Sequence, residues 1–181
     1  MIGPWCATLS GRRYYPQNPQ PAQFSLTDVA SGLGNTCRFG GQCPRFYSVA
    51  EHSVLVARVV ERMAPALAFA ALMHDAAEAY LGDVPTPLKL CLPSYETLER
   101  ATLAAIFEAF AIPGDPYDSV IKRADLAVLR TEVVQFEMDW GEAHPQGAPA
   151  DVALECWDPA WAQGAFLAAF SRYRRLLGRA P

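Results

Sequence analysis

The chain has 181 residues, a length that fits one domain with its own hydrophobic core. Hydrophobic residues make up 51% of it and charged residues 19%, a globular composition that excludes extensive disorder. The formal net charge of −4 argues against a general binder of nucleic-acid polymers, which needs a basic surface. No apolar run approaches the roughly 20 residues that cross a bilayer.

The N-terminus lacks the basic start and long apolar segment of a signal peptide. Five irregularly spaced cysteines indicate reduced thiols rather than a disulfide framework. We therefore expect a cytoplasmic protein without a membrane partner.

Prolines at 16, 19 and 21 predict that residues 1–24 form an extended N-terminal arm, followed by one domain over 25–181. Ser25 is placed to cap a short helix over about 26–34. The loop after it, residues 37–41, contains two adjacent glycines that leave the backbone free to bend.

Ser48 and Glu51 form a capping-box pattern that predicts a helix over about 49–63. His52 belongs to the apolar stripe of this helix, three residues after Val49 and four before Val56. We therefore expect the imidazole of His52 to point toward the core.

Prolines and capping residues in the rest of the chain predict further helices, and no alternating strand pattern is present. The expected fold class is therefore all-α. Pro65 opens a helix to about Leu81, and Pro85 and Pro87 predict an extended stretch after it. Further helices are expected from Ser94 to about Ala111, from Asp115-Pro116 to about Trp140, and from Asp158-Pro159 onward.

The segment that begins with His74-Asp75 contains the strongest chemical signal. On a helix, His74 and Glu78 share one face and Asp75 lies beside them. An imidazole and a carboxylate side by side can bind one divalent cation, with Mn²⁺, Co²⁺, Fe²⁺, Zn²⁺ and Mg²⁺ as candidates. Glu78 can then hold a water molecule next to that cation.

Asp125 places a carboxylate on the inward stripe of its predicted helix, together with Glu132, and no cation is visible on that face. A shared metal ion is one partner that such a buried carboxylate can have. Buried salt bridges with Arg58 or Arg130 are the alternative that residue spacing leaves open. Glu96, Glu99 and Arg100 are interpreted as a solvated helix face.

These residues also resemble a known family. His52, then His74-Asp75, then Asp125 look like the H…HD…D signature of HD-domain phosphohydrolases, and the run 74–89 resembles small bacterial and phage 5'-deoxynucleotidases and deoxynucleoside-triphosphate hydrolases. The resemblance spans roughly residues 35–135, although the Arg38 loop and the gap from His52 to His74 differ in length from those relatives. It implies a single HD-domain helical bundle around one divalent metal ion, held by His52, His74, Asp75 and Asp125.

The resemblance also implies roles for neighbouring side chains. Glu78 matches a water-orienting carboxylate, and Asp83 matches a second catalytic carboxylate near the scissile phosphate. The implied substrate-binding residues are Arg38, Phe39, Thr86 and Lys89.

The expected function is therefore that of a metal-dependent hydrolase in nucleotide metabolism, first a 5'-nucleotidase that releases phosphate from deoxynucleoside monophosphates. A deoxynucleoside-triphosphate triphosphohydrolase and a non-catalytic nucleotide or metal sensor stay open. A cyclic-nucleotide phosphodiesterase is disfavoured because His144 is the only histidine left for a second metal. A zinc peptidase is excluded because the pattern is not His-Glu-x-x-His. The aromatic last helix leaves a homo-oligomer open.

Overall fold

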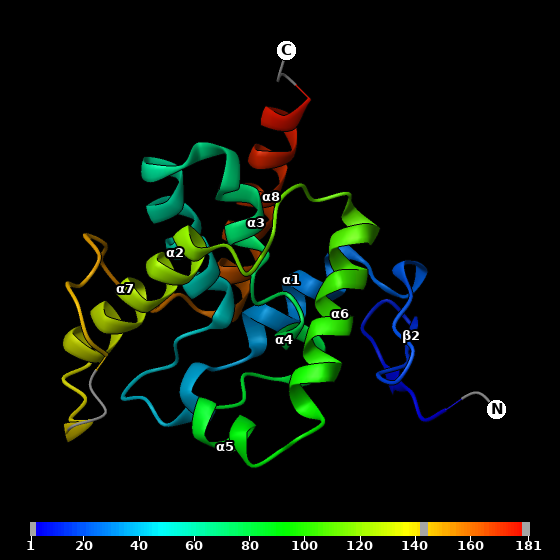
Figure 1. Cartoon of the computed structure of the whole chain (residues 1–181), viewed down its shortest axis with the longest axis horizontal. Coiled ribbons are helices and arrows are strands. Elements are labelled where there is room, and N and C mark those ends of the chain that lie inside the picture. The colour runs from blue at the N-terminus through cyan, green and yellow to red at the C-terminus, as the bar shows by residue number, and fades with distance from the viewer. Residues whose placement is uncertain (1–2, 142–144, 179–181) are drawn as a thin grey trace.

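The computed structural model describes residues 3–141 and 145–178, so His144 lies outside the described residues. Their fold is mostly helical, which confirms the all-α prediction (Figure 1). The helices are α1 (Leu26–Asn35), α2 (Val49–Met63), α3 (Ala68–Leu72), α4 (Glu78–Leu81), α5 (Thr86–Leu90), α6 (Tyr95–Phe110), α7 (Ser119–Gln135) and α8 (Pro159–Leu177). Short 3-10 turns cover Pro21–Gln23, Arg38–Gly41 and Pro65–Leu67, and β1 (Cys6–Ala7) pairs antiparallel with β2 (Arg13–Tyr14).

Helix α2 is the centre of the bundle and packs against α1, α3, α7 and α8. Its residues from Val49 to Ala57 are all buried, as expected of a helix surrounded by others. The predicted bounds of this helix are confirmed, and the Ser48 hydroxyl accepts a hydrogen bond from the Glu51 N–H. The central position of α2 places His52 in the interior.

The helix expected from Pro65 to Leu81 is instead interrupted. A 3-10 turn and α3 lead to Leu72, residues 73–77 form successive turns, and α4 begins only at Glu78. In the turns, backbone N–H groups bond three residues back, as from Ala76 to Met73 and from Glu78 to Asp75. The tighter winding rotates His74 and Asp75 away from the arrangement that a continuous α-helix would give them.

Three other boundaries differ from the prediction, one of them the end of α7, which lies at Gln135 rather than at about Trp140. The stretch with Pro85 and Pro87 contains α5, because both prolines occupy the start of a helix, where their missing N–H groups are not needed. Helix α7 is capped by the Asp118 carboxylate, which accepts from the Val120 N–H, whereas Asp115 caps only a turn at Tyr117. The predicted α1 and α8 are confirmed, with Ser25 and Asp158 as their caps.

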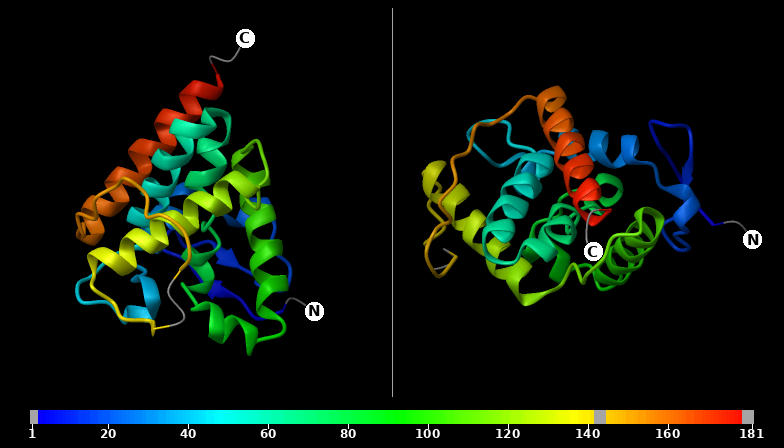
Figure 2. Two further views of the ribbon diagram at one scale, coloured as in Figure 1. Left: turned by 60° about the vertical axis from the view of Figure 1, so that its left-hand side comes forward. Right: turned by 90° about the horizontal axis from the view of Figure 1, so that it is seen from above.

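The N-terminal segment is tied to the bundle rather than free of it. Tyr14 is fully buried, and its hydroxyl lies 2.7 Å from the Thr102 hydroxyl of α6. Figures 1 and 2 show this segment at one end of the long axis and α7 at the other. Within the described chain, no helix has the length and apolar character needed to cross a membrane.

Candidate metal and phosphate site

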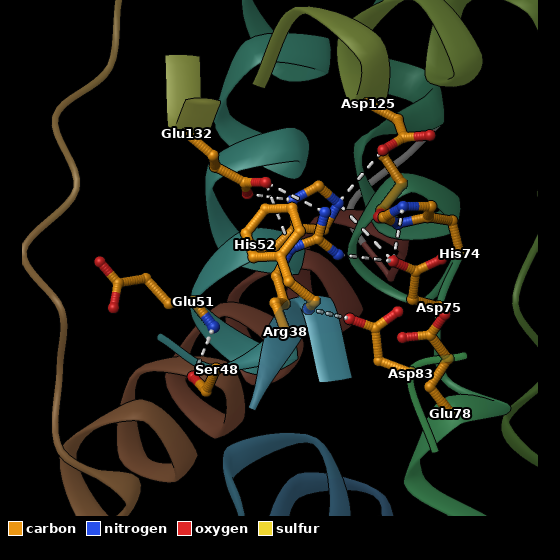
Figure 3. Close-up of polar contacts among 12 residues, drawn as sticks. Arg38, Ser48, Glu51, His52, His74, Asp75, Glu78, Asp83, Asp125 and Glu132 are labelled. Carbon is orange, nitrogen blue, oxygen red and sulfur yellow. Dashed lines mark hydrogen bonds and ion pairs between the residues drawn. The ribbon is translucent and has the colours of Figure 1, made fainter. Parts of the chain in front are cut away.

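His52 has both ring nitrogens in the interior, facing different partners (Figure 3). Its Nδ1 lies 2.7 Å from Glu132 Oε1, and its Nε2 lies 3.3 Å from Asp125 Oδ1 and 3.6 Å from Asp75 Oδ2. The ionised Glu132 carboxylate can only accept, so Nδ1 is the nitrogen that donates to it. The Nε2 lone pair of the neutral ring is therefore left facing the two aspartates.

His74 is oriented in the same way by the backbone. Its Nδ1 donates to the Ala71 carbonyl oxygen over 2.8 Å, a contact made by the tight turns after α3. Its Nε2 lies 3.2 Å from Asp75 Oδ2. A carbonyl oxygen only accepts hydrogen bonds, so this ring too presents an unprotonated Nε2 when neutral.

These groups converge on one point from α2, the 73–77 turns and α7. Donor atoms of His52, His74 and Asp125 all lie within 4.8 Å of one another, and this group could hold a metal ion. Metal–ligand distances near 2.0–2.2 Å place neighbouring donors roughly 3 Å apart, close to the separations observed. Among the described residues, His52 Nε2 and His74 Nε2 are buried without a hydrogen-bond partner, which fits atoms that ligate a cation.

Charge in the cluster is strongly coupled. Burial and the Arg38 guanidinium oppose protonation of His52, but the Glu132 and Asp125 carboxylates outweigh them and raise its pKa to about 9. Burial also opposes ionisation of Asp75, but the imidazoles of His74 and His52 hold the pKa of that carboxyl well below its usual value. The lowered pKa keeps the Asp75 carboxylate in the ionised form that binds metal, whereas the raised pKa of His52 means that its ring must lose a proton before it can ligate.

Arg38 enters the cluster from the loop that precedes α2. A backbone bridge between Cys37 and Ser48 closes the loop, and the Arg38 N–H donates to the Tyr47 carbonyl. Arg38 Nη2 and Nε lie 3.0 and 3.3 Å from Glu132 Oε2, while Nη1 lies 3.9 Å from Asp75 Oδ2. The buried cation among these acids is thus Arg38, and not Arg58 or Arg130 as the alternative had it.

Phe39 occupies a left-handed backbone conformation, with φ of 58°, that non-glycine residues rarely adopt. Its N–H donates to Asp83 Oδ2 over 3.0 Å, and its ring packs edge-on against Trp140. This contact places Asp83 beside the Arg38 loop. Strain of this kind persists where surrounding contacts hold it, frequently at binding sites.

Glu78 and Lys89 lie on the other side of the cluster. Glu78 is 5% exposed, and its Oε1 lies 3.6 Å from Lys89 Nζ. Burial and the charges of Asp75 and Asp83 raise the pKa of Glu78 well above its usual value. Thr86 is exposed at the start of α5.

Glu99 corrects the interpretation of the α6 surface. Glu96 and Arg100 do form an exposed ion pair, but Glu99 turns toward the site and contacts Lys89 Nζ at 2.6 Å. Its position is one helical step from the exposed pair, so sequence alone assigned it to the same face.

An open cavity of about 210 Å³ adjoins the cluster. It is lined by His74, Asp75, Ala77, Lys89, Glu99, Leu103, Pro116, Tyr117, Ile121, Lys122 and Asp125. Lys122 lies 2.7 Å from Asp125 Oδ2, so the helix does carry a cation next to this acid. Lys122 was not among the predicted site residues, although a spacing of three residues from Asp125 is a recognisable ion-pair pattern.

Two relatives are similar to most of this chain, and no family model matches it. The uncharacterized protein YfdR of Escherichia coli is 40% identical over 145 residues, which cover 79% of each chain. The uncharacterized protein RCAP_rcc00048 of Rhodobacter capsulatus is 38% identical over 142 residues, covering 73% of this chain and 72% of the relative. Neither name states an activity. The chain therefore belongs to the protein family that includes YfdR of Escherichia coli.

Proposed function

We propose that the protein is a divalent-metal-dependent phosphohydrolase of nucleotides, and that it releases phosphate from deoxynucleoside 5'-monophosphates. The observation that carries the proposal is the pair of buried, unpartnered Nε2 atoms of His52 and His74, facing the carboxylates of Asp75 and Asp125. Two imidazoles and two carboxylates suit Mn²⁺, Co²⁺, Fe²⁺ or Zn²⁺, with Mg²⁺ the hardest of the candidates. The resemblance to HD-domain nucleotidases supports the nucleotide substrate.

Cationic side chains on three different segments surround the site. The Nη1 of Arg38, the Nζ of Lys89 and the Nζ of Lys122 lie near Asp75, Glu78 and Asp125, respectively. These groups can attract a phosphate and neutralise its oxygens. When bound, a divalent metal ion adds Lewis-acid stabilisation of a phosphoryl oxygen.

Glu78 is the proposed proton acceptor for the attacking water. Its Oε2 is buried without a hydrogen-bond partner among the described residues, so this oxygen is free to take a proton. A raised pKa moves the titration of the Glu78 carboxyl toward neutral pH, where a group accepts and returns protons most effectively. Asp83, held beside Phe39, is the second carboxylate that can deliver a proton to the leaving oxygen.

Triphosphate release from deoxynucleoside triphosphates is the second candidate. It is favoured by the number of cations, since Arg38, Lys89 and Lys122 could neutralise more than one phosphate group. The same site would serve both reactions, and the product distinguishes them.

The test is a panel of deoxy- and ribonucleoside mono- and triphosphates, each assayed with Mn²⁺, Co²⁺ and Mg²⁺ for phosphate and triphosphate. We expect phosphate from the deoxynucleoside monophosphates, and its loss in the Asp125→Asn variant. The matched control Glu96→Gln alters an exposed ion pair on α6 and should keep full activity. If the native protein binds metal but turns over no nucleotide, the enzyme proposal fails and a sensor function is favoured.

A further inference from the structure

Glu132 is a fully buried carboxylate in the last turns of α7, seven residues after Asp125. Its two oxygens have different partners: Oε1 accepts from His52 Nδ1, and Oε2 accepts from Nη2 and Nε of Arg38. Figure 3 shows Glu132 on the side of the His52 ring away from His74 and Asp75. It is thus behind the metal cluster and not among the atoms that face it.

A carboxylate without solvent contact needs compensation for its charge. The bonds with His52 and Arg38 supply it, and the Arg38 guanidinium and the His52 imidazole lower the pKa of Glu132 despite its burial. The arrangement also constrains both partners. A ring whose Nδ1 donates to a carboxylate keeps its Nε2 as the acceptor, and an arginine held at Nη2 and Nε can only present Nη1 to the site.

We infer that Glu132 is a positioning residue: it fixes His52 with Nε2 toward the metal and aims Nη1 of Arg38 beside Asp75. One carboxylate thereby connects a metal ligand on α2 with a phosphate-binding arginine in the preceding loop. This inference rests on the proposed metal site and assigns that site a residue in addition to its ligands and catalytic carboxylates.

Glu51 offers a matched comparison. It is also fully buried and precedes His52 on α2, but its oxygens accept from the backbone N–H groups of residues 155–157 at 2.7 to 3.0 Å. It anchors the segment before α8 and makes no contact with the metal cluster among those described. A purely structural carboxylate should behave like Glu51.

The first experiment measures Mn²⁺ affinity by electron paramagnetic resonance in the native chain, Glu132→Gln and Glu51→Gln. The glutamine amide at 132 has one acceptor oxygen, so it can accept from His52 or from Arg38, and its NH₂ group then faces the other donor. We expect Mn²⁺ binding to weaken by about 10- to 100-fold in Glu132→Gln. Glu51→Gln should lower the melting temperature while its Mn²⁺ affinity stays within about twofold of native. Equal affinity of Glu132→Gln and native protein would overturn the inference.

The second experiment needs no variant at Glu132 and covers the case in which Glu132→Gln does not fold. In the native, Zn²⁺-loaded chain, ¹⁵N-detected correlation spectra report which ring nitrogen of His52 carries a proton; its signal is assigned by its loss in His52→Gln. Ligation through Nε2 leaves the proton on Nδ1 in any case, so the informative signal is the chemical shift of that proton. We expect it far downfield, because Nδ1 donates to the ionised Glu132 carboxylate over 2.7 Å. The shift of an ordinary imidazole N–H would contradict the positioning role.

The two proposals can fail separately. If the native chain binds Mn²⁺ and Glu132→Gln binds it weakly, but no nucleotide is hydrolysed, the positioning role stands and the enzyme function falls. If nucleotides are hydrolysed and Glu132→Gln keeps native Mn²⁺ affinity, the enzyme function stands and the positioning role falls. Absence of Mn²⁺ binding by the native chain would overturn the inference together with the metal site.

Discussion

Glu78 combines three properties that a proton-transferring carboxylate needs. It is buried, one of its oxygens lacks a hydrogen-bond partner among the described residues, and it lies between the acids Asp75 and Asp83 that raise its pKa. Lys89 lies 3.6 Å away and tempers this repulsion. A residue that served only to hold the fold would have both oxygens satisfied.

Replacing Glu78 with glutamine should therefore remove proton transfer without removing the metal. We expect kcat to fall by about 10²- to 10⁴-fold, the usual contribution of a general base. Mn²⁺ affinity should stay near native, because none of the donor atoms proposed to ligate the metal belongs to Glu78. Steady-state kinetics with the best nucleotide, together with an Mn²⁺ titration, check both statements. Unchanged kcat would move the base to another residue.

The His52 imidazole would couple the metal affinity of the proposed site to pH. In the protein without bound metal, the pKa of His52 is raised from 6.5 to about 9. The charged ring therefore stabilises the folded state fully below about pH 6.5, and this contribution is lost as the pH rises through about 9. Metal binding requires the neutral ring and releases the proton. Asp75 and Asp125 have lowered pKa values and stay ionised over the pH range in which His52 titrates.

Apparent Mn²⁺ affinity should consequently increase about tenfold per pH unit from about pH 6 to 8 and level off above about 9. Calorimetry in two buffers of different ionisation enthalpy should count about one proton released per metal ion. An affinity that is flat between these pH values would show that His52 is already neutral before the metal binds.

At the scale of elements, the close approach of α1 to α4 positions the start of α4, where Glu78 lies. A Cβ on Gly32 of α1 would lie 2.5 Å from the Ala79 carbonyl oxygen and 2.7 Å from the Ala79 Cα. These atoms belong to the backbone, which cannot move aside as a side chain can. The two helices must separate if the residue is enlarged.

Gly32→Ala should lower the free energy of unfolding by about 1–3 kcal/mol, measured by urea titration. Gly164 is the matched control, since it is also helical and a Cβ there meets no heavy atom within 4 Å. Gly164→Ala should stabilise the protein by about 0.5–1 kcal/mol because alanine loses less backbone freedom on folding. Similar effects at the two sites would argue against the tight α1–α4 contact.

Element boundaries show where sequence reasoning succeeds and where it stops. The Ser48 cap and a stripe of apolar residues predicted α2 to the residue, because both signals are local. The turns at 73–77 could not be predicted, since residues three and four apart fit an α-helix and a tighter winding equally well. Asp115 was predicted as the cap because a proline follows it, but Asp118, three residues later, has the same side chain and caps the helix instead.

The candidate metal-binding residues could be predicted from the sequence, but the residues that hydrogen-bond to them and orient them could not. An inward carboxylate at 132 was visible from periodicity, but its partners Arg38 and His52 lie 94 and 80 residues away in the chain. The contact between Lys89 and Glu99 likewise joins α5 to α6 through the fold. Such pairs depend on how helices pack, which local sequence patterns do not encode.

At the scale of the whole molecule, the proposed metal would join three separate parts of the chain: α2, the turns at 73–77, and α7. These segments converge only in the folded state, so the proposed metal would bind the native protein in preference to the unfolded chain. Binding of this kind stabilises the native state by mass action.

Mn²⁺ at about 100 times its dissociation constant should therefore add about 2.7 kcal/mol to the free energy of unfolding. For a chain of this length the melting temperature should rise by about 5–10 °C. Scanning calorimetry with and without the metal tests this, and a chelator should reverse the shift. Asp125→Asn should lose the shift in melting temperature because it removes a charged ligand from the cluster. Glu96→Gln, on the exposed face of α6, should keep the shift. A shift of equal size in both variants would mean that Mn²⁺ acts elsewhere on the protein.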